Sequence, residues 1–517
     1  MSSLFPALTE GRTDRPALRF GHRSLTYAEL ATAADALAHR LTGHARVAVW
    51  ATPTLETAVA VVAALRAGVA AVPLNPKSGE KELGHILGDS APALVLAAPG
   101  DELPSPVRDL PRVGIDIDTA CDTDTEAPGA GRLPDAPASG SASASASGST
   151  SDSTSGSGSG SDSGSDDAPA LVVYTSGTTG PPKGAVIPRR AISSTLDALA
   201  DAWRWTGDDV LVHGLPLFHV HGLVLGILGP LRRGGSVRHL GRFTTEGVTR
   251  ELTDGATMLF GVPTMYHRIA EALPDDPALA TALSRARLLV SGSAALPVHD
   301  HERITSVTGQ RVIERYGMTE TLMNTSVRAD GEPRPGTVGV PLPGVELRLV
   351  EEDGTPITSY DGETVGEIQV RGPNLFTGYL NRPDATAAAF TADGWFRTGD
   401  MAVRDPDGYV RIVGRKATDL IKSGGYKIGA GEIENALLEH PGVREAAVTG
   451  EPDADLGERI VAWVVPADPQ SPPSAEELAD HVARRLAPHK RPRVVHHLDA
   501  LPRNDMGKIM KRALDRG

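Results

Sequence analysis

The sequence predicts an α/β protein with a large N-terminal domain, a β-rich subdomain within it and a smaller α+β C-terminal domain. Buried strands alternate with helices over the first part of the chain, short strands with Pro-Gly and Asp-Gly turns fill residues 336–413, and a further unit of helices and strands follows. The length of 517 residues also exceeds what one hydrophobic core normally organises. We therefore expect domains at residues 1–414 and 415–517.

The N-terminal alternation begins with two strands around a turn at Gly21 and continues with a helix opened by Thr26. Thr26 and Glu29 have the spacing of a capping box, in which each side chain accepts a hydrogen bond from the other residue's backbone N–H. A strand at residues 46–50, a helix from about residue 55 and a strand at residues 70–73 follow. This order favours a parallel sheet covered by helices.

Residues 134–167 consist almost entirely of Ser, Gly, Ala and Asp, which cannot form a core, so we expect a flexible surface insertion. Beyond it, apolar strands begin near residues 170, 210, 258, 287 and 312, and small or polar residues follow each of them. Open α/β sheets bind ligands at the carboxyl edge of their strands. The sequence therefore predicts a binding site at that edge.

The last hundred residues form a separate pattern. A helix is expected from residue 431, strands at residues 444–448 and 460–465, and a second helix at residues 474–486. This segment is long enough to fold as a small domain of its own.

Composition limits the classes of function. The net charge of −14 argues against a nucleic-acid or anionic-membrane surface, so an anionic ligand would need local cations. The single cysteine, Cys121, excludes an internal disulfide and fits a reducing compartment. The N-terminus has no signal-peptide pattern, and the apolar stretch at residues 57–73 is interrupted by Arg66 and Gly68. We expect a cytoplasmic protein without membrane or nucleic-acid partners, as a monomer or weak dimer.

Residues 174–184 (YTSGTTGPPKG) follow the buried strand at residues 170–173 and predict a phosphate-binding loop. The glycines allow backbone N–H groups to approach phosphate oxygens, the hydroxyls add donors, and Lys183 adds a positive charge. A P-loop has Ser or Thr after its lysine to hold magnesium, whereas Gly184 stands here. The metal ligand is therefore expected elsewhere in the chain. A Ser/Gly linker is the alternative, but it would need neither the strand nor the lysine.

Five motifs in order give the chain a specific resemblance. They are YTSGTTGPPK (174–183), ERYGMTE (314–320), WFRTGD (395–400), GR (414–415) with SGGYKI (423–428), and LPRNDMGK (501–508). The chain resembles the adenylate-forming superfamily of acyl-CoA synthetases, peptide-synthetase adenylation domains and firefly-type luciferases. The resemblance implies a mobile C-terminal domain and the substrates ATP and coenzyme A with Mg²⁺. It also implies a two-step reaction, in which an acyl-AMP forms with release of pyrophosphate and a thiol then displaces AMP.

The resemblance assigns roles to residues of this sequence. Glu320 matches the magnesium ligand, and Asp400, assisted by Arg415, matches the ribose-binding aspartate. Lys508 matches the catalytic lysine that the small domain supplies, and Thr319 completes the catalytic set. The implied ATP-binding residues are Thr175, Ser176, Gly177, Thr178, Thr179, Lys183, Ser293, Ala294, Ala295, Glu314, Arg315, Tyr316, Gly317, Met318, Asp400 and Arg415.

The second half of the reaction is assigned to the small domain. The implied coenzyme A channel comprises Ser423, Gly424, Gly425, Tyr426 and Lys427. The segment between the Gly-Arg pair and the Gly-Gly pair is one residue longer than in many superfamily members, so either Lys416 or Ala417 is the expected hinge. Rotation is expected because Lys508 and the 423–427 loop must reach the same site in turn.

The acyl pocket is predicted from His219, His221, Arg287, Ser291 and Met318. A short dicarboxylate needs a cation for its unreactive carboxylate, and a guanidinium can bind it bidentately, so Arg287 is the preferred clamp. In detail the motifs resemble malonyl-CoA synthetases. The predicted reaction is ATP-dependent ligation of malonate to coenzyme A, with methylmalonate as a further candidate substrate.

Three alternatives stay open at the level of sequence. The first is a medium-chain or aryl acyl-CoA synthetase, which would need an apolar pocket floor. The second is an adenylation enzyme that loads a carrier-protein thiol. The third is a non-catalytic nucleotide-binding protein, against which the presence of both Glu320 and Lys508 counts.

Overall fold

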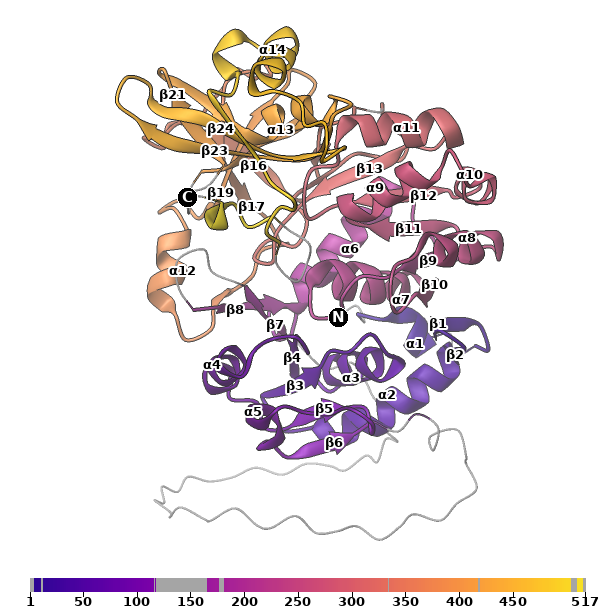
Figure 1. The fold of residues 1–517 in the computed structure, drawn as a ribbon. Coiled ribbons are helices and arrows are strands. Elements are labelled where there is room, and N and C mark those ends of the chain that lie inside the picture. Colours follow the sequence, from indigo (N-terminus) through magenta and orange to yellow (C-terminus); the bar gives the residue numbers. More distant parts are fainter. Residues whose placement is uncertain are drawn as a thin grey trace, which may run out of the picture.

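The structure is a computed structural model, and its α/β architecture confirms the predicted fold class (Figure 1). It describes residues 4–10, 13–115, 117, 165–175, 181–332, 334–416, 419–503 and 509–514. Residues 134–164 of the predicted insertion, the predicted site residues Ser176, Gly177, Thr178, Thr179 and Lys508, and the hinge candidate Ala417 lie outside these ranges. None of the helices in the described ranges is both long and apolar enough to span a bilayer.

Two large sheets form the core of the N-terminal domain. The nine-stranded sheet contains, in spatial order, β15 (Val340–Pro341), β14 (Thr325–Ser326), β13 (Val312–Tyr316), β12 (Leu288–Ser291), β11 (Met258–Gly261), β9 (Val210–His213), β10 (Ser236–His239), β1 (Pro16–Phe20) and β2 (Arg23–Thr26). The seven-stranded sheet contains β18 (Gly378–Tyr379), β8 (Lys183–Pro188), β7 (Pro169–Thr175), β4 (Ala70–Leu74), β3 (Arg46–Trp50), β5 (Val95–Ala97) and β6 (Arg112–Gly114). Strands β9 to β13 pair in parallel, as the alternation predicts.

Helices fill the space between the two sheets and cover both outer faces. The inner layer consists of α2 (Tyr27–Leu41), α3 (Leu55–Arg66), α6 (Arg189–Trp203), the π-helix η1 (His221–Leu228) and α7 (Gly229–Arg233), with α1 (Pro6–Glu10) beside them. One outer layer consists of α8 (Thr245–Thr253), α9 (Pro263–Ala272), α10 (Pro277–Ser284) and α11 (Val298–Thr308), and the other of α4 (Glu80–Ser90) and α5 (Ser105–Arg108). The inner position of α3 explains why its apolar residues run all round the helix.

Local sequence signals account for several element boundaries. The capping box of α2 is present, since the Thr26 side chain accepts from the Glu29 backbone and the Glu29 carboxylate accepts from the Thr26 backbone at 2.7 Å. Residues 221–228, which follow β9 and a short loop, form η1, a π-helix. Added Cβ atoms at Gly222 and Gly226 would overlap the Pro216 carbonyl and the His213 ring, so these glycines allow its close approach to the preceding loop.

The segment after residue 340 forms a four-stranded antiparallel sheet of β16 (Glu346–Val350), β17 (Gly366–Arg371), β19 (Phe396–Arg404) and β20 (Val410–Arg415), with α12 (Pro383–Ala389) beside β18. The C-terminal domain has its own sheet of β22 (Tyr426–Gly429), β21 (Leu420–Ser423), β24 (Gly457–Pro466), β23 (Val443–Asp453) and β25 (Val494–His497). Its helices are α13 (Ala430–Leu438), α14 (Ala475–Arg485), η2 (Pro488–Lys490) and η3 (Lys511–Ala513).

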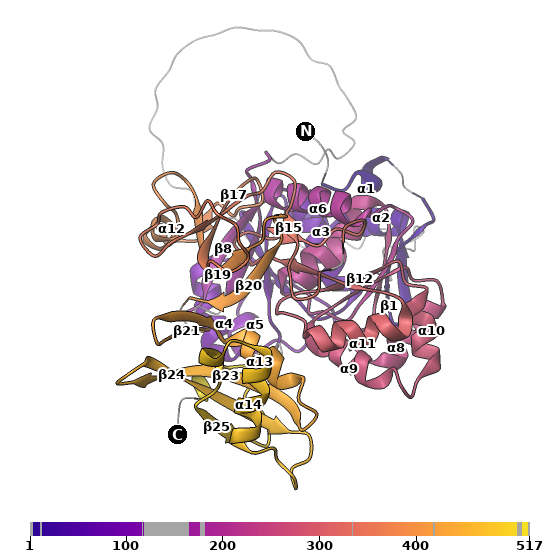
Figure 2. The ribbon, with the colours of Figure 1, turned by 90° about the horizontal axis from the view of Figure 1, so that it is seen from above.

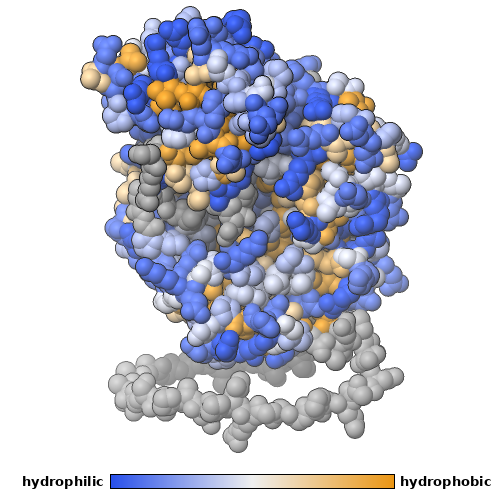
Figure 3. Space-filling model, viewed as in Figure 1, coloured by the Kyte–Doolittle hydropathy of each residue, from blue (hydrophilic) through white to orange (hydrophobic). Residues whose placement is uncertain are grey.

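The C-terminal domain forms a separate lobe, which lies at the top of Figure 1 and at the bottom of Figure 2. It has its own apolar core, formed by α13, α14 and its strands. Most of the visible surface is hydrophilic, and the hollow between the two lobes is among the places where apolar residues reach the surface (Figure 3).

Candidate active site

The phosphate loop is described only at its two ends. Thr175 ends β7 and Lys183 begins β8, and the two residues face each other across an antiparallel pair. The Lys183 ammonium lies 4.2 Å from the centre of the Tyr379 ring. Tyr379 is therefore a neighbour of the loop that the sequence analysis missed, because it lies almost two hundred residues away and reaches β8 only through β18.

Tyr379 also connects this lysine to the predicted magnesium ligand. Its hydroxyl donates a hydrogen bond of 2.8 Å to the Glu320 carboxylate, which is 6% exposed. A carboxylate oxygen is the type of ligand that Mg²⁺ prefers, so Glu320 fits a magnesium ion held beside the phosphates. Thr319 is half-buried in the turn that leads to Glu320, and Met318 packs against the neighbouring apolar cluster.

The predicted ribose site is assembled from three strands. The Tyr316 hydroxyl donates to Asp400 Oδ2 at 2.6 Å, and Arg415 Nε lies 2.7 Å from Asp400 Oδ1. Burial raises the pKa of Tyr316, which keeps its phenol protonated as a donor. Asp400 thus lies with an aromatic ring and a cation beside it, as a ribose and adenine site requires.

The Ser293–Ala295 loop follows the carboxyl end of β12, and a side chain of the adjacent strand β13 binds the backbone directly after it. Ser293 has a φ of 78°, which is unusual for a residue with a side chain. Glu314 Oε1 accepts a hydrogen bond of 2.9 Å from the backbone N–H of Leu296, the residue directly after this loop, and burial raises the pKa of Glu314 to about 7. The Glu314 side chain therefore positions the loop. Gly317 lies against the Leu322 carbonyl, which leaves no room for a Cβ.

Arg287 does not lie in the site, and its prediction as the carboxylate clamp is wrong. It precedes β12, at the amino end of the strand, whereas the other predicted residues follow the carboxyl ends. Its Nε and Nη2 pair with the two oxygens of the buried Asp209 at 2.9 and 2.7 Å, and its Nη1 donates to the Trp203 carbonyl at 2.8 Å. The guanidinium therefore pairs with a structural carboxylate that lies 78 residues away in the chain, so local sequence does not reveal this pair.

The Arg287→Met variant should therefore lose stability while its affinity for the acyl substrate is unchanged. Removing the guanidinium leaves Asp209 partly unpaired, at a cost of about 2 kcal/mol in the free energy of unfolding. Urea denaturation measures this cost, and steady-state kinetics measure the KM for malonate. A large rise in that KM with no loss of stability would contradict the structural role and restore Arg287 to the pocket.

A different arginine, Arg315, lies fully buried beside the end of β12. An added Cβ at Gly292 would overlap its guanidinium, so this glycine makes the room that the side chain uses. Burial lowers the pKa of Arg315 to about 10, which still leaves it charged at neutral pH. Within the described residues, its Nε and Nη2 atoms have no hydrogen-bond partner.

Buried polar atoms of three other predicted residues surround the same region. Ser291 pairs with Glu314 across β12 and β13, and its hydroxyl lacks a partner among the described residues, as do ring nitrogens of His219 and His221. Burial lowers the pKa of His219 to about 4 and that of His221 well below its usual value, with the Arg315 charge adding to the effect on His221. We name Ser291, His219, His221 and Arg315 the acyl cluster. Its neutral imidazoles and single cation suit a small anionic ligand.

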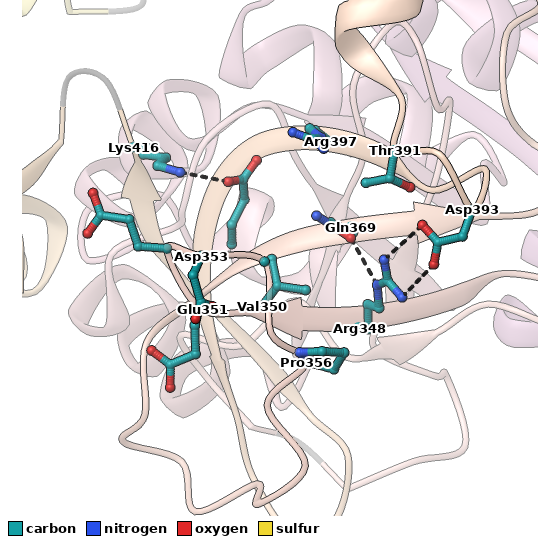
Figure 4. A pocket seen from close by; sticks show the side chains of 13 residues that line it. Arg348, Val350, Glu351, Asp353, Pro356, Gln369, Thr391, Asp393, Arg397 and Lys416 are labelled. Atoms are coloured by element: carbon teal, nitrogen blue, oxygen red, sulfur yellow. Dashed lines mark hydrogen bonds and ion pairs between the residues drawn. The ribbon is translucent and has the colours of Figure 1, made fainter.

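The remaining predicted residues lie at the domain junction. Lys416 Nζ pairs with Glu367 of β17 at 2.9 Å, and its backbone N–H donates to the Gly399 carbonyl, so Lys416 is held by the large domain. It lines a cavity of about 460 Å³ with charged walls on the outer face of the four-stranded sheet (Figure 4). Among the predicted site residues that the structure describes, Lys416 alone lines this cavity.

The predicted coenzyme A loop forms the turn between β21 and β22. Gly424 and Gly425 have φ values of 59° and 83°, and Lys427 is half-buried in β22. Tyr426 is 55% exposed, and its ring stacks on His489 with 4.0 Å between centroids. An exposed aromatic ring at a glycine-rich turn is available to a ligand that approaches from solvent.

Comparison with known proteins identifies the family. Residues 6–380 match the model of the AMP-binding enzymes, and residues 432–508 match that of the AMP-binding enzyme C-terminal domain. The chain is 38% identical to a probable CoA ligase, CCL8, from Humulus lupulus, over 93% of this chain and 81% of that protein. It is 42% identical to a malonate–CoA ligase from Arabidopsis thaliana, over 67% of this chain and 60% of that protein.

Solved structures agree with this assignment. A malonyl-CoA ligase in a ternary product complex with methylmalonyl-CoA and AMP is 74% identical, with a TM-score of 0.70, over 96% of this chain and 100% of that one. ATP-bound MatB from Rhodopseudomonas palustris is 34% identical, with a TM-score of 0.82, over 99% of this chain and 98% of that one. The fold and the sequence matches lead to one conclusion: this chain belongs to the AMP-binding enzymes of the adenylate-forming superfamily.

Proposed function

We propose that this protein ligates malonate, and methylmalonate, to coenzyme A with ATP, through an acyl-AMP intermediate and with release of AMP and pyrophosphate. The observation that carries the choice of acid is the buried Arg315 guanidinium in the acyl cluster. A fatty or aromatic acyl chain would leave this charge unpaired in an apolar environment, whereas a second carboxylate would neutralise it. The names of two similar proteins, a malonate–CoA ligase and a malonyl-CoA ligase with methylmalonyl-CoA and AMP bound, support the same substrates.

The acyl cluster can orient a dicarboxylate as well as bind it. Arg315 provides a fork of donors for one carboxylate, and the Ser291 hydroxyl and the His221 imidazole can donate to the same group. The other carboxylate is then left to face the nucleotide side, where Asp400 and Tyr316 hold the ribose and adenine. This arrangement places one carboxylate for attack on the α-phosphate and removes the other from the reaction.

Formation of the acyl-AMP brings two anions together, so positive charge must surround the α-phosphate. Lys183 supplies charge at the leaving phosphates, and Lys508 is proposed to supply it at the reacting carboxylate. When bound, magnesium adds charge to the phosphates, and Glu320 would hold it. The chain on either side of Lys508 is fixed, since Arg503 pairs with Glu445 and Lys511 pairs with Asp419 at 3.0 Å.

Thioester formation is proposed to follow rotation of the small domain about a point just after Lys416. The chain superimposes better on the ATP-bound relative with 34% identity than on the product complex with 74% identity. The relative with the more similar sequence thus gives the lower TM-score, which is expected if the two domains are arranged differently in the two solved structures. Rotation would exchange Lys508 for the 423–427 loop at the active site.

A substrate panel tests this function. With ATP and magnesium, malonate should be converted to a coenzyme A thioester with a kcat/KM at least about a hundredfold above acetate, octanoate and cinnamate, because only malonate pairs with Arg315. Thioester formation is followed by chromatography, with coenzyme A and an acyl carrier protein as alternative acceptors. Preference for a monocarboxylate would refute the dicarboxylate assignment, and preference for the carrier protein would refute the acceptor.

A further inference from the structure

A second group of ligand-type side chains lies on the outer face of the nine-stranded sheet, away from the acyl cluster. Helices α9 and α11 pack against each other there (Figure 2), and they bring together His267, His299 and Asp300. His267 Nδ1 lies 3.1 Å from Asp300 Oδ2, and His299 Nε2 lies 3.2 Å from Asp300 Oδ1. One ligand atom from each of the three residues falls within 4.8 Å of the others.

The burial of the three side chains differs in a way that suits a metal site. The Asp300 side chain is 1% exposed, and among the described residues its hydrogen-bond and ion-pair partners are the two imidazoles. A carboxylate buried to this extent needs positive charge nearby. The His267 and His299 side chains are 36% and 30% exposed, so an ion from solvent can reach their nitrogens.

The orientation of His267 provides a second argument. Its Nδ1 faces Asp300, while its Nε2 lies 3.5 Å from the Glu271 carboxylate, one turn further along α9. A carboxylate behind an imidazole fixes the ring and leaves the other nitrogen as a ligand, which is the usual arrangement around protein-bound zinc. Two ligand atoms of a tetrahedral zinc ion are about 3.3 Å apart at ordinary bond lengths, close to the separations found here.

We propose that His267, His299 and Asp300 bind one divalent transition-metal ion, such as Zn²⁺ or Co²⁺, at a site separate from that of magnesium. Two imidazoles and one carboxylate favour these ions over Mg²⁺, which prefers oxygen ligands and bound water. Three protein ligands leave at least one position open to water or to a further ligand.

The electrostatic surroundings attract a cation, and they include the small domain. The carboxylates of Asp300 and Glu271 lie 3.1 and 3.5 Å from the ring nitrogens of His267, and the negative charge of Glu445 also acts on this side chain. Glu445 belongs to β23 of the C-terminal domain, so the site faces the junction at which that domain meets the large one. These carboxylates would also stabilise a bound divalent cation.

Titration of the full-length, tag-free protein with Co²⁺ in excess Mg²⁺ tests the site. One equivalent should bind with the visible absorption of nitrogen- and oxygen-ligated cobalt, and Zn²⁺ should displace it. The His299→Ala variant removes a partly exposed ligand and should weaken binding at least about tenfold, with an unchanged melting temperature. Glu271→Gln should weaken binding by a smaller factor, because it removes only the group that orients His267.

The His44→Ala variant is the matched control, since His44 is an exposed histidine outside the cluster. It should bind Co²⁺ as the unmodified protein does. Equal affinity in the unmodified protein, His299→Ala and His267→Ala, or no binding at all, would overturn the proposal and leave a hydrogen-bonded cluster in which Asp300 pairs with a protonated imidazole. The readout is metal binding, so the outcome does not depend on whether malonate is the substrate.

Discussion

Replacing Arg315 by methionine should lower kcat/KM for malonate about a thousandfold. The variant keeps most of the side-chain volume but removes the cation that is proposed to bind the second carboxylate, a loss on the order of 4 kcal/mol for a buried charge-assisted pair. The kcat/KM for propionate, which has no second carboxylate, should fall much less. Rates with both acids at saturating ATP measure the difference.

Two further measurements decide what Arg315 does. Arg315→Lys keeps the charge without the bidentate geometry. Its kcat/KM for malonate should lie between those of the unmodified protein and Arg315→Met. The Arg315→Met protein should melt at no lower temperature, because a buried guanidinium whose Nε and Nη2 lack partners among the described residues does not stabilise the apoprotein. If the kcat/KM values for malonate and propionate fall equally and the KM for ATP rises, Arg315 binds the nucleotide instead.

Replacing Lys508 by alanine should lower the rate of acyl-AMP formation by a factor of at least about a hundred. The lysine is assigned to the carboxylate and α-phosphate in the first step, where removal of one charged contact to the transition state typically costs 3 kcal/mol or so. Pyrophosphate release measures this step. Thioester formation from supplied malonyl-AMP and coenzyme A should change only a few-fold, since Lys508 is proposed to have left the site by then.

The matched control for Lys508 is Lys490→Met in the same domain. Lys490 pairs with Glu432 at 2.7 Å within the small domain, and its loss should leave both steps nearly unchanged. An equal loss of both half-reactions in Lys508→Ala would contradict the separation of roles. Lys508 would then contribute to the general stability of the domain junction.

The sequence alone determined the order of strands and helices, because hydrophobic periodicity and local caps are properties of neighbouring residues. The capping box of α2 and the parallel strands β9 to β13 are found as predicted. Motifs of two to ten residues also indicated the residues that are proposed for the nucleotide side of the site. Tyr316 lies 84 residues before Asp400 in the chain, yet its side chain meets Asp400 and Arg415, which come from the neighbouring strands β19 and β20.

The tertiary structure decided which arginine faces the acyl cluster. Arg287 lies at the amino end of β12, where Asp209 pairs with it. Arg315 lies inside the neighbouring strand β13, and its side chain packs against Gly292. Tyr379 likewise became a neighbour of Lys183 and Glu320 only through the pairing of β18 with β8. Local sequence fixes the conformation of a segment, whereas the partner of a long side chain depends on strands brought together from distant parts of the chain.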